Sequence, residues 1–210
     1  MGSNGGVLGR RNVPGVDGFS GVWSMREIAN AARLGLWPPY DLFDIDTTAK
    51  YTQVADAAGT WAVSGGELVA TGGTQAHFIR NAVSFKDGWV EADMNHAHDG
   101  GLVLRFVNNS NYYLAALSDD SGSAPTENVR IFKRVGGTYT QLGSSVNIAW
   151  TRGVSKTFRF QAVGTTIQVF VDGVSQLSVT DSAIAGPGGV GIRNNVSGNQ
   201  SKYQALRWFF

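Results

Sequence analysis

Apolar and polar residues alternate along several stretches of this chain from residue 89 onward. In the first stretch Val90, Ala92 and Met94 are separated by Glu91 and Asp93. The same period of two recurs at residues 102–107, 157–162, 167–171 and 206–210. Successive side chains of a strand point to opposite faces, so each stretch predicts a strand with one buried face.

Turn signals that contain glycine separate these stretches, at residues 64–66, 87–88, 99–100, 136–137, 163–165 and 172–173. The spacing predicts about a dozen short strands, as in a sandwich or a barrel. No helical period is present between residues 60 and 210. We therefore predict an all-β domain over residues 41–210, in which two antiparallel sheets bury their alternating apolar positions face to face.

The first 40 residues follow a different pattern. Residues 1–23 are rich in Gly, Ser, Asn and Val without a regular period, which is typical of an extended arm. Ser24 and Glu27 fit a capping box, and an apolar stripe follows from Met25 to Ala32. Gly35 and the prolines after it would end a helix of about ten residues, too short to be stable alone. Residues 1–40 are thus predicted to be a docking arm with one short helix.

Composition and charge exclude several classes of protein. The 17 basic and 16 acidic side chains leave a net charge of +1, so binding to nucleic acid by bulk electrostatics is not expected. The chain has no cysteine, which excludes disulfides, thiolate zinc sites and a cysteine nucleophile. No apolar run approaches the length of a membrane span, and none of signal-peptide length follows Met1, so we expect synthesis in the cytoplasm without membrane insertion.

The region from residue 41 to residue 210 resembles the concanavalin A-like jelly-roll superfamily, particularly its laminin-G-like and glucanase-like members. The stretches that carry this resemblance, in the order typical of the family, are residues 59–68, 101–106, 111–113, 167–173, 181 and 188–192. The resemblance implies a two-sheet antiparallel jelly-roll sandwich. It says little about activity, because this fold occurs in lectins, hydrolases and structural modules alike.

The N-terminal region resembles the leader of many tailed-bacteriophage virion proteins. Gly6, Gly9, Asn12 and Pro14 have its spacing, and residues 20–24 and 37–39 continue it. In those proteins such a leader precedes an adhesin or a lectin-like domain. The resemblance implies that this chain is located in the virion, anchored to other virion proteins through residues 1–40. The anchoring side chains would be Arg10, Arg11, Asn12, Pro14, Trp23 and Trp37.

Glu91 and Asp93 are the candidates for glycan chemistry. Glucanase-like members carry a strand with Glu-x-Asp-x-x-Glu, in which the two glutamates act as nucleophile and acid, and here His96 occupies the position of the second glutamate. Hydrolysis with retention needs two carboxyl groups about 5–5.5 Å apart, so the incomplete pair argues against an enzyme. Trp89, predicted to lie exposed beside Glu91 and Asp93, would instead form a sugar-binding surface with Tyr112, unless the arm or a neighbouring subunit covers it.

Calcium is the metal that the resemblance suggests, because laminin-G-like members bind it between loops at one rim of the sandwich. Oxygen donors are present in two loops, at Asp119, Asp120, Asn194 and Asn195. Residues 119–123 equally fit a plain loop, and no fixed ligand spacing distinguishes the two interpretations. No cofactor other than calcium is expected.

The sequence as a whole favours a non-enzymatic bacteriophage virion protein. Its arm would attach to the particle, and its lectin-like module would bind a host surface glycan as a tail or fibre adhesin. Two alternatives remain open, namely a capsid decoration protein and a glycan-cleaving enzyme of glucanase-like fold. Virion adhesins are often trimers, so a homo-oligomer is expected, although the chain has no heptad repeat.

Overall fold

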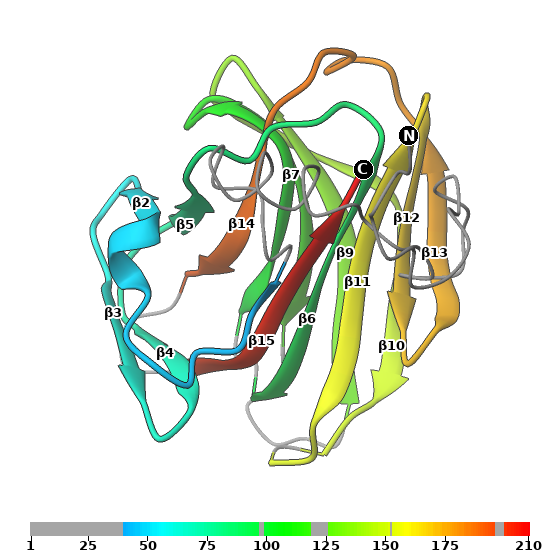
Figure 1. Ribbon diagram of the computed structural model, residues 1–210. Coiled ribbons are helices and arrows are strands. Elements are labelled where there is room, and N and C mark those ends of the chain that lie inside the picture. Colours follow the sequence, from blue (N-terminus) through cyan, green and yellow to red (C-terminus); the bar gives the residue numbers. More distant parts are fainter. Residues whose placement is uncertain (1–39, 97–98, 119–125, 152, 196–199) are drawn as a thin grey trace, which may run out of the picture.

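The computed structural model describes residues 40–96, 99–118, 126–151, 153–195 and 200–210 (Figure 1). These residues form fifteen strands and one 3-10 helix, η1 (Thr48–Lys50). Every pairing between the strands is antiparallel. The prediction of an all-β, two-sheet antiparallel jelly-roll sandwich is confirmed. The predicted arm and its short helix lie outside the described residues.

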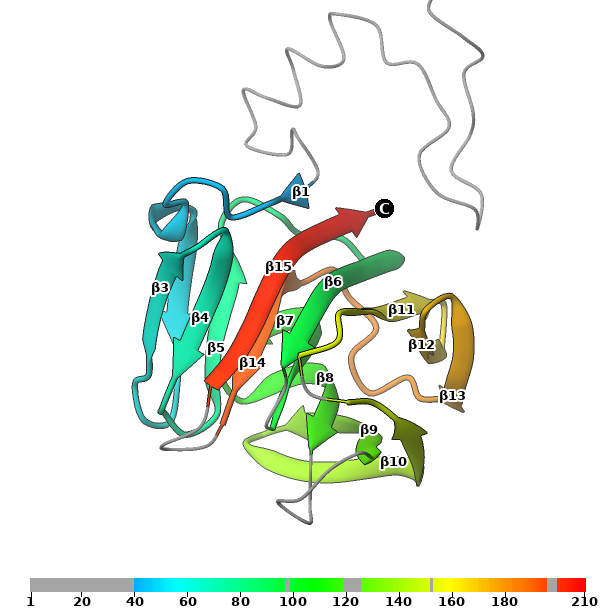
Figure 2. The ribbon, with the colours of Figure 1, turned by 90° about the horizontal axis from the view of Figure 1, so that it is seen from below.

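The strands divide into two sheets, which lie as separate layers in Figure 2. Sheet A has the order β13 (Val174–Thr180), β12 (Thr166–Val171), β11 (Lys156–Val163), β6 (Gly88–His96), β15 (Gln200–Phe209), β4 (Glu67–Thr71) and β3 (Thr60–Ser64), and β1 (Tyr40–Asp41) pairs with β15. Sheet B has the order β10 (Thr138–Ala149), β9 (Thr126–Val135), β8 (Asn111–Ser118), β7 (Gly100–Asn108), β14 (Gly189–Asn194), β5 (Ala76–Arg80) and β2 (Tyr51–Val54).

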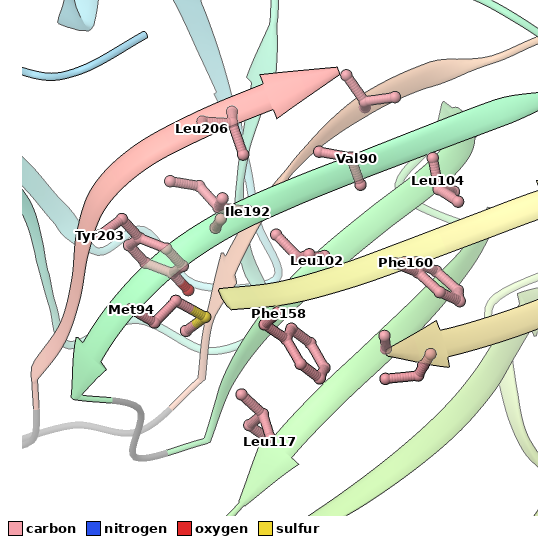
Figure 3. Close-up of a cluster of buried hydrophobic side chains, with 14 of the residues drawn as sticks. Val90, Met94, Leu102, Leu104, Leu117, Phe158, Phe160, Ile192, Tyr203 and Leu206 are labelled. Atoms are coloured by element: carbon pink, nitrogen blue, oxygen red, sulfur yellow. The ribbon is translucent and has the colours of Figure 1, made fainter. Parts of the chain in front are cut away.

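The main core lies between the two sheets. Figure 3 shows Val90 and Met94 of β6 beside Leu102 of β7 and Phe158 of β11, and none of the four side chains is exposed. These are the inward positions that the alternation predicts. Burial of each such side chain stabilises the fold by about 1.5–3 kcal/mol. No helix among the described residues is long and apolar enough to cross a membrane.

The alternation breaks in the middle of β7. Leu102 and Leu104 belong to the main core, but Phe106 packs on the opposite face of sheet B. Arg105, between them, has a φ of 47° in the left-handed region, and the register with β8 shifts between Leu104 and Asn108. The expectation that Phe106 lies on the same face as Leu104 is therefore wrong, because this bulge moves it to the other face.

Candidate functional site

Trp89 lies on the outer face of sheet A, but it is not the exposed surface that the alternation predicts. Its ring stacks on Phe209 with centroids 6.0 Å apart, and the guanidinium of Arg159 lies 4.5 Å from its centroid. These neighbours leave 7% of the side chain exposed. The prediction of an exposed Trp89 is wrong, because alternation places a side chain on a face without showing what covers it. Its role in sugar binding stays a prediction.

Glu91 and Asp93 share this face with Trp89, and both carboxylates form ion pairs with arginines. Glu91 accepts from Arg159 Nε at 2.7 Å and lies 3.5 Å from Arg207. Asp93 accepts from Arg207 at 2.5 Å and from the Thr157 hydroxyl at 2.9 Å. Burial would raise the pKa of Asp93, but the hydrogen bonds from Arg207 and Thr157 prevail and lower it. Asp93 therefore remains a carboxylate at neutral pH and does not supply an acid.

Tyr112 belongs to the other sheet, so the structure does not bring the predicted sugar-binding residues together. It lies on the outer face of sheet B and is fully buried there. Val103 and Leu114, on the same face, are also buried. The predicted grouping of Tyr112 with Trp89 is therefore wrong, since the main core separates their two faces.

Burial on the outer face of sheet B results from a pronounced curl of the sheet. β5 and β8 are three strand intervals apart, or about 14 Å in a flat sheet. The rings of His77 on β5 and Tyr112 on β8 nevertheless have centroids 4.6 Å apart. The hydroxyl of Tyr139 on β10 donates to Gln75 Oε1, just before β5, at 2.8 Å. Five intervals, about 24 Å, would separate those strands in a flat sheet. The outer face is therefore concave. We call its two sides the wings, one formed by β8, β9 and β10 and the other by β5 and β2, and side chains of the two wings are in contact.

Polar side chains connect the wings in a continuous network. Arg134 of β9 donates to both carboxylate oxygens of Asp56, after β2, at 3.1 Å each, and Asn109 donates to Asp56 at 2.7 Å. The Arg134 guanidinium also lies over the Tyr139 ring, 5.0 Å from its centroid. Tyr139 in turn contacts the hydroxyl of Tyr112. Three strands, β8, β9 and β10, and the two connections that carry Asp56 and Asn109 thus contribute to one site.

The network continues through Gln75 to a second arginine. Arg193 donates through Nε to Gln75 Oε1 at 2.9 Å and through Nη1 to Asp99 Oδ1 at 3.0 Å. Asn195 donates to the other oxygen of Asp99 and accepts from the Gln75 backbone N–H at 2.8 Å. Arg134 and Arg193, the two arginines of this network, are therefore each paired with an aspartate.

Burial dominates the titration of the aromatic and imidazole groups in this network. It lowers the pKa of His77 to about 3, with the positive charge of Arg193 as the next cause. Burial raises the pKa of Tyr112 and of Tyr139 above the ordinary tyrosine value. All three side chains are therefore neutral at physiological pH. Among the residues that the structure places, this face combines half-buried aromatic rings with amides, hydroxyls and guanidinium groups that are paired with aspartates.

The model of one protein family matches residues 38–204 of the chain, and its description is "3-keto-alpha-glucoside-1,2-lyase-like domain". The chain belongs to this family. Comparison with curated proteins gave no match.

Several solved structures similar to this lyase-like domain are carbohydrate-binding or glycan-active proteins. The carbohydrate-binding module CBM66 from Bacillus subtilis has 17% identity and a TM-score of 0.59, over 76% of this chain and 91% of that one. A glycoside hydrolase family 16 endo-glucanase from Bacteroides ovatus has 12% identity and a TM-score of 0.57, over 81% and 99%. A xylan β-1,4-xylosidase from Bacillus halodurans has 13% identity and a TM-score of 0.62, over 82% and 39%.

These similarities confirm the concanavalin A-like jelly roll, and the domain has the fold of carbohydrate-binding and glycan-active proteins. The resemblance of the leader to tailed-phage virion proteins stays a prediction. Its anchoring residues, from Arg10 to Trp37, lie outside the described residues.

The predicted calcium ligands of the lyase-like domain do not gather at one place as far as the structure describes them. Asp119 and Asp120 lie outside the described residues. Asn194 is fully buried, donates to the Gly72 carbonyl at 2.7 Å and accepts from the Ser201 hydroxyl at 2.9 Å. Asn195 belongs to the network around Asp99. The side-chain oxygens of both asparagines thus accept hydrogen bonds already, and calcium binding stays a prediction.

Sequence reasoning missed most of the residues in the concave face. Gln75 and His77 lie in one stretch and Arg134 and Arg193 in two others, and no spacing motif links the three. Tyr112 and Arg134 are register partners on the adjacent strands β8 and β9. Contact between His77 and Tyr112 follows only from the curl of the sheet, which alternation does not encode.

Proposed function

We propose that this chain is a glycan-binding module that holds the end of an α-glucoside on the concave face of sheet B and does not cleave it. The observation that carries this proposal is the convergence of both wings on one mixed aromatic and polar site. Phe106, Phe132 and Tyr139 are partly buried rings on that face. Such rings can stack on the apolar face of a sugar, while amide, hydroxyl and guanidinium groups fix its hydroxyls. The family description supports the choice of an α-glucoside.

The proposal excludes cleavage because arginines pair with the carboxylates on both outer faces. Arg134 and Asn109 lower the pKa of Asp56 despite the opposing effect of burial. Arg193 forms an ion pair with Asp99. Arg159 pairs with Glu91, and Arg207 pairs with Asp93. A glycosidase needs one carboxyl group with a raised pKa to protonate the leaving oxygen. The pKa values of Asp56 and Asp93 are lowered instead, and Asp99 and Glu91 are paired with arginines, which supports binding without hydrolysis.

Lyase chemistry is the second candidate, favoured by the family match. Elimination from a 3-keto sugar needs a general base that takes a proton next to the ketone. Neutral His77 has the right ring chemistry for such a base, but its pKa of about 3 makes it too weak a base to take that proton at neutral pH. Binding alone therefore has the stronger support.

We expect titration calorimetry to detect binding of maltose or trehalose to the full chain, with weaker binding of β-linked cellobiose. Tyr139→Ala should weaken binding at least tenfold, because it removes both the ring and the hydroxyl from the site. Trp89→Phe, on the outer face of sheet A, is the matched control and should leave binding unchanged. Incubation with the same sugars and with 3-keto-α-glucosides should yield no product. Enzymatic turnover, or binding lost only in Trp89→Phe, would contradict the proposal.

We further propose that the module is a bacteriophage adhesin carried on the virion by residues 1–40, as a homo-oligomer. The resemblance of residues 6–39 to tailed-phage leaders supports this role. A capsid decoration protein is the alternative within the virion.

Deletion of residues 1–39 should abolish attachment to purified particles and leave a cooperative thermal transition. β1 begins at Tyr40 and pairs with β15, so this deletion spares the strands of the sandwich. Co-sedimentation with particles and a thermal melt measure the two effects. Full occupancy by the truncated chain would contradict anchoring through the arm. Particle binding by a full chain that binds no glycan would favour decoration over adhesion.

A further inference from the structure

His77 is a buried polar side chain without a hydrogen-bond partner among the described residues. It has no exposed surface, and neither ring nitrogen has a well-aligned hydrogen bond; the backbone of Val54 is close enough to favour the protonated ring but does not meet that geometry. Its ring packs edge-on against Tyr112 at 4.6 Å and lies 6.0 Å from Phe106. An unsatisfied buried polar group costs about 1–3 kcal/mol, so native proteins seldom keep one without a reason. An apolar residue of similar shape would pack at this position without that cost.

The surroundings of His77 favour its neutral form. Arg193, its register partner on β14, and Arg134 on β9 oppose a positive charge, while Asp56 and the backbone of Val54 favour it. Neutral imidazole offers one N–H donor and one acceptor nitrogen. A sugar hydroxyl, which both donates and accepts, complements that pair. Because an aspartate already pairs with each arginine, the chemistry at this position suits an uncharged ligand.

Tyr112, which packs against His77, is linked to Tyr139 and through it to Gln75. The Tyr112 and Tyr139 hydroxyls contact each other, and Tyr139 donates to Gln75 Oε1 at 2.8 Å. Gln75 also accepts from Arg193 at 2.9 Å, and its φ of 44° lies in the sparsely populated left-handed region. We call these three residues, Gln75, Tyr112 and Tyr139, the clasp. Its contacts join the wings of sheet B beside His77.

We propose that the clasp opens for the glycan and that His77 then hydrogen-bonds a hydroxyl of the terminal sugar. This inference rests on the proposed function. It adds the residue that recognises the sugar and the contact that controls access of the sugar to that residue. Opening exchanges the Tyr139–Gln75 bond for bonds to the ligand and satisfies the imidazole. The tyrosine rings remain available to pack against the sugar once they have moved apart.

Substitution of His77 tests the recognition step. We expect His77→Phe to bind maltose or trehalose at least tenfold more weakly by calorimetry, while its melting temperature stays equal or rises, because the unsatisfied imidazole is gone. His77→Gln keeps one donor and one acceptor and should retain affinity within about threefold of wild type. Unchanged affinity in a folded His77→Phe would overturn the proposal, since a histidine that only fills the core contributes nothing to binding.

Tyr139→Phe tests the gate, because it removes the hydroxyl that bonds Gln75 and keeps the ring. Stopped-flow measurements should show a severalfold faster association rate for this variant. Tyr40→Phe, a hydroxyl deletion at an exposed residue on sheet A, is the control and should associate at the wild-type rate. An association rate equal to that of wild type in Tyr139→Phe would show that the clasp does not gate the site.

The outcomes separate this inference from the proposed function. Wild type that binds none of the α-glucosides contradicts the proposed function, and the inference fails with it. If wild type binds them, but His77→Phe has the wild-type affinity and Tyr139→Phe the wild-type association rate, the inference alone is contradicted. Weaker binding by His77→Phe together with faster association by Tyr139→Phe supports both.

Discussion

Methionine in place of Arg105 is expected to lower the free energy of unfolding by about 3–5 kcal/mol, because three carbonyl groups lose their shared donor at about 1–3 kcal/mol each. The Arg105 side chain is 1% exposed. It donates to the carbonyls of Lys86, Ile184 and Gly164 at 2.8, 2.9 and 2.7 Å, and to Asp87 at 3.3 Å. These acceptors come from three connections at one rim of the sandwich. Methionine would fill the volume and leave the carbonyls without donors.

Chemical denaturation of the variant against wild type measures this loss. Arg105→Lys should lie between the two, because an ammonium group cannot reproduce the fork of the guanidinium. Arg159→Met is the matched control. Its side chain is 24% exposed and makes one close ion pair, with Glu91, so its loss should cost about 1 kcal/mol. Equal stabilities of Arg105→Met and Arg159→Met would contradict the role of Arg105 in joining the rim.

Acidification from pH 7 to pH 4.5 is expected to lower the free energy of unfolding by about 2–3 kcal/mol through His77. The folded-state pKa of His77 is about 3, whereas an unfolded histidine titrates near its ordinary value of 6.5. Between these values the unfolded chain binds one more proton than the folded chain. Stability therefore falls as the pH falls through this window, by at most about 1.4 kcal/mol per pH unit.

Denaturation series at pH 7, 6, 5 and 4.5 on wild type and His77→Phe isolate this effect. The groups that face His77 are Arg193, Arg134, Asp56 and Tyr112. Asp56 has a lowered pKa and loses its stabilising pairing only at lower pH, below about 4. The variant should thus show a shallower slope than wild type across the whole series. Parallel slopes in the two proteins would show that His77 is protonated in the folded state.

Alternation along the chain was sufficient to predict the two-layered fold. Val90, Ala92 and Met94 point into the main core as expected, and so do Phe158 and Phe160. Glycines with positive φ occupy the turns at Gly65, Gly136, Gly164 and Gly173, where the dipeptide signals placed them. Both features are local, because the period of a strand and the torsion angles of a turn depend on residues adjacent in the chain.

The same patterns were insufficient wherever a neighbour from elsewhere in the chain decides the outcome. Alternation placed Trp89 on an outer face, but Phe209 and Arg159 cover it. It placed Phe210 in the core, whereas 48% of that side chain is exposed. The bulge at Arg105 moves Phe106 to the other side of its sheet. Each difference arises from packing or strand register, which a period of two does not contain.

The amino-acid sequence by itself determined the strands, the turns and the faces on which most side chains lie. Only the tertiary structure decided which of those faces became a site. His77 meets Tyr112, and Gln75 meets Tyr139, although three and five strand intervals separate their strands. Those contacts depend on the curvature of sheet B, the sum of small twists and bulges over all its strands. Residues far apart in the chain therefore share a site for which no local pattern exists.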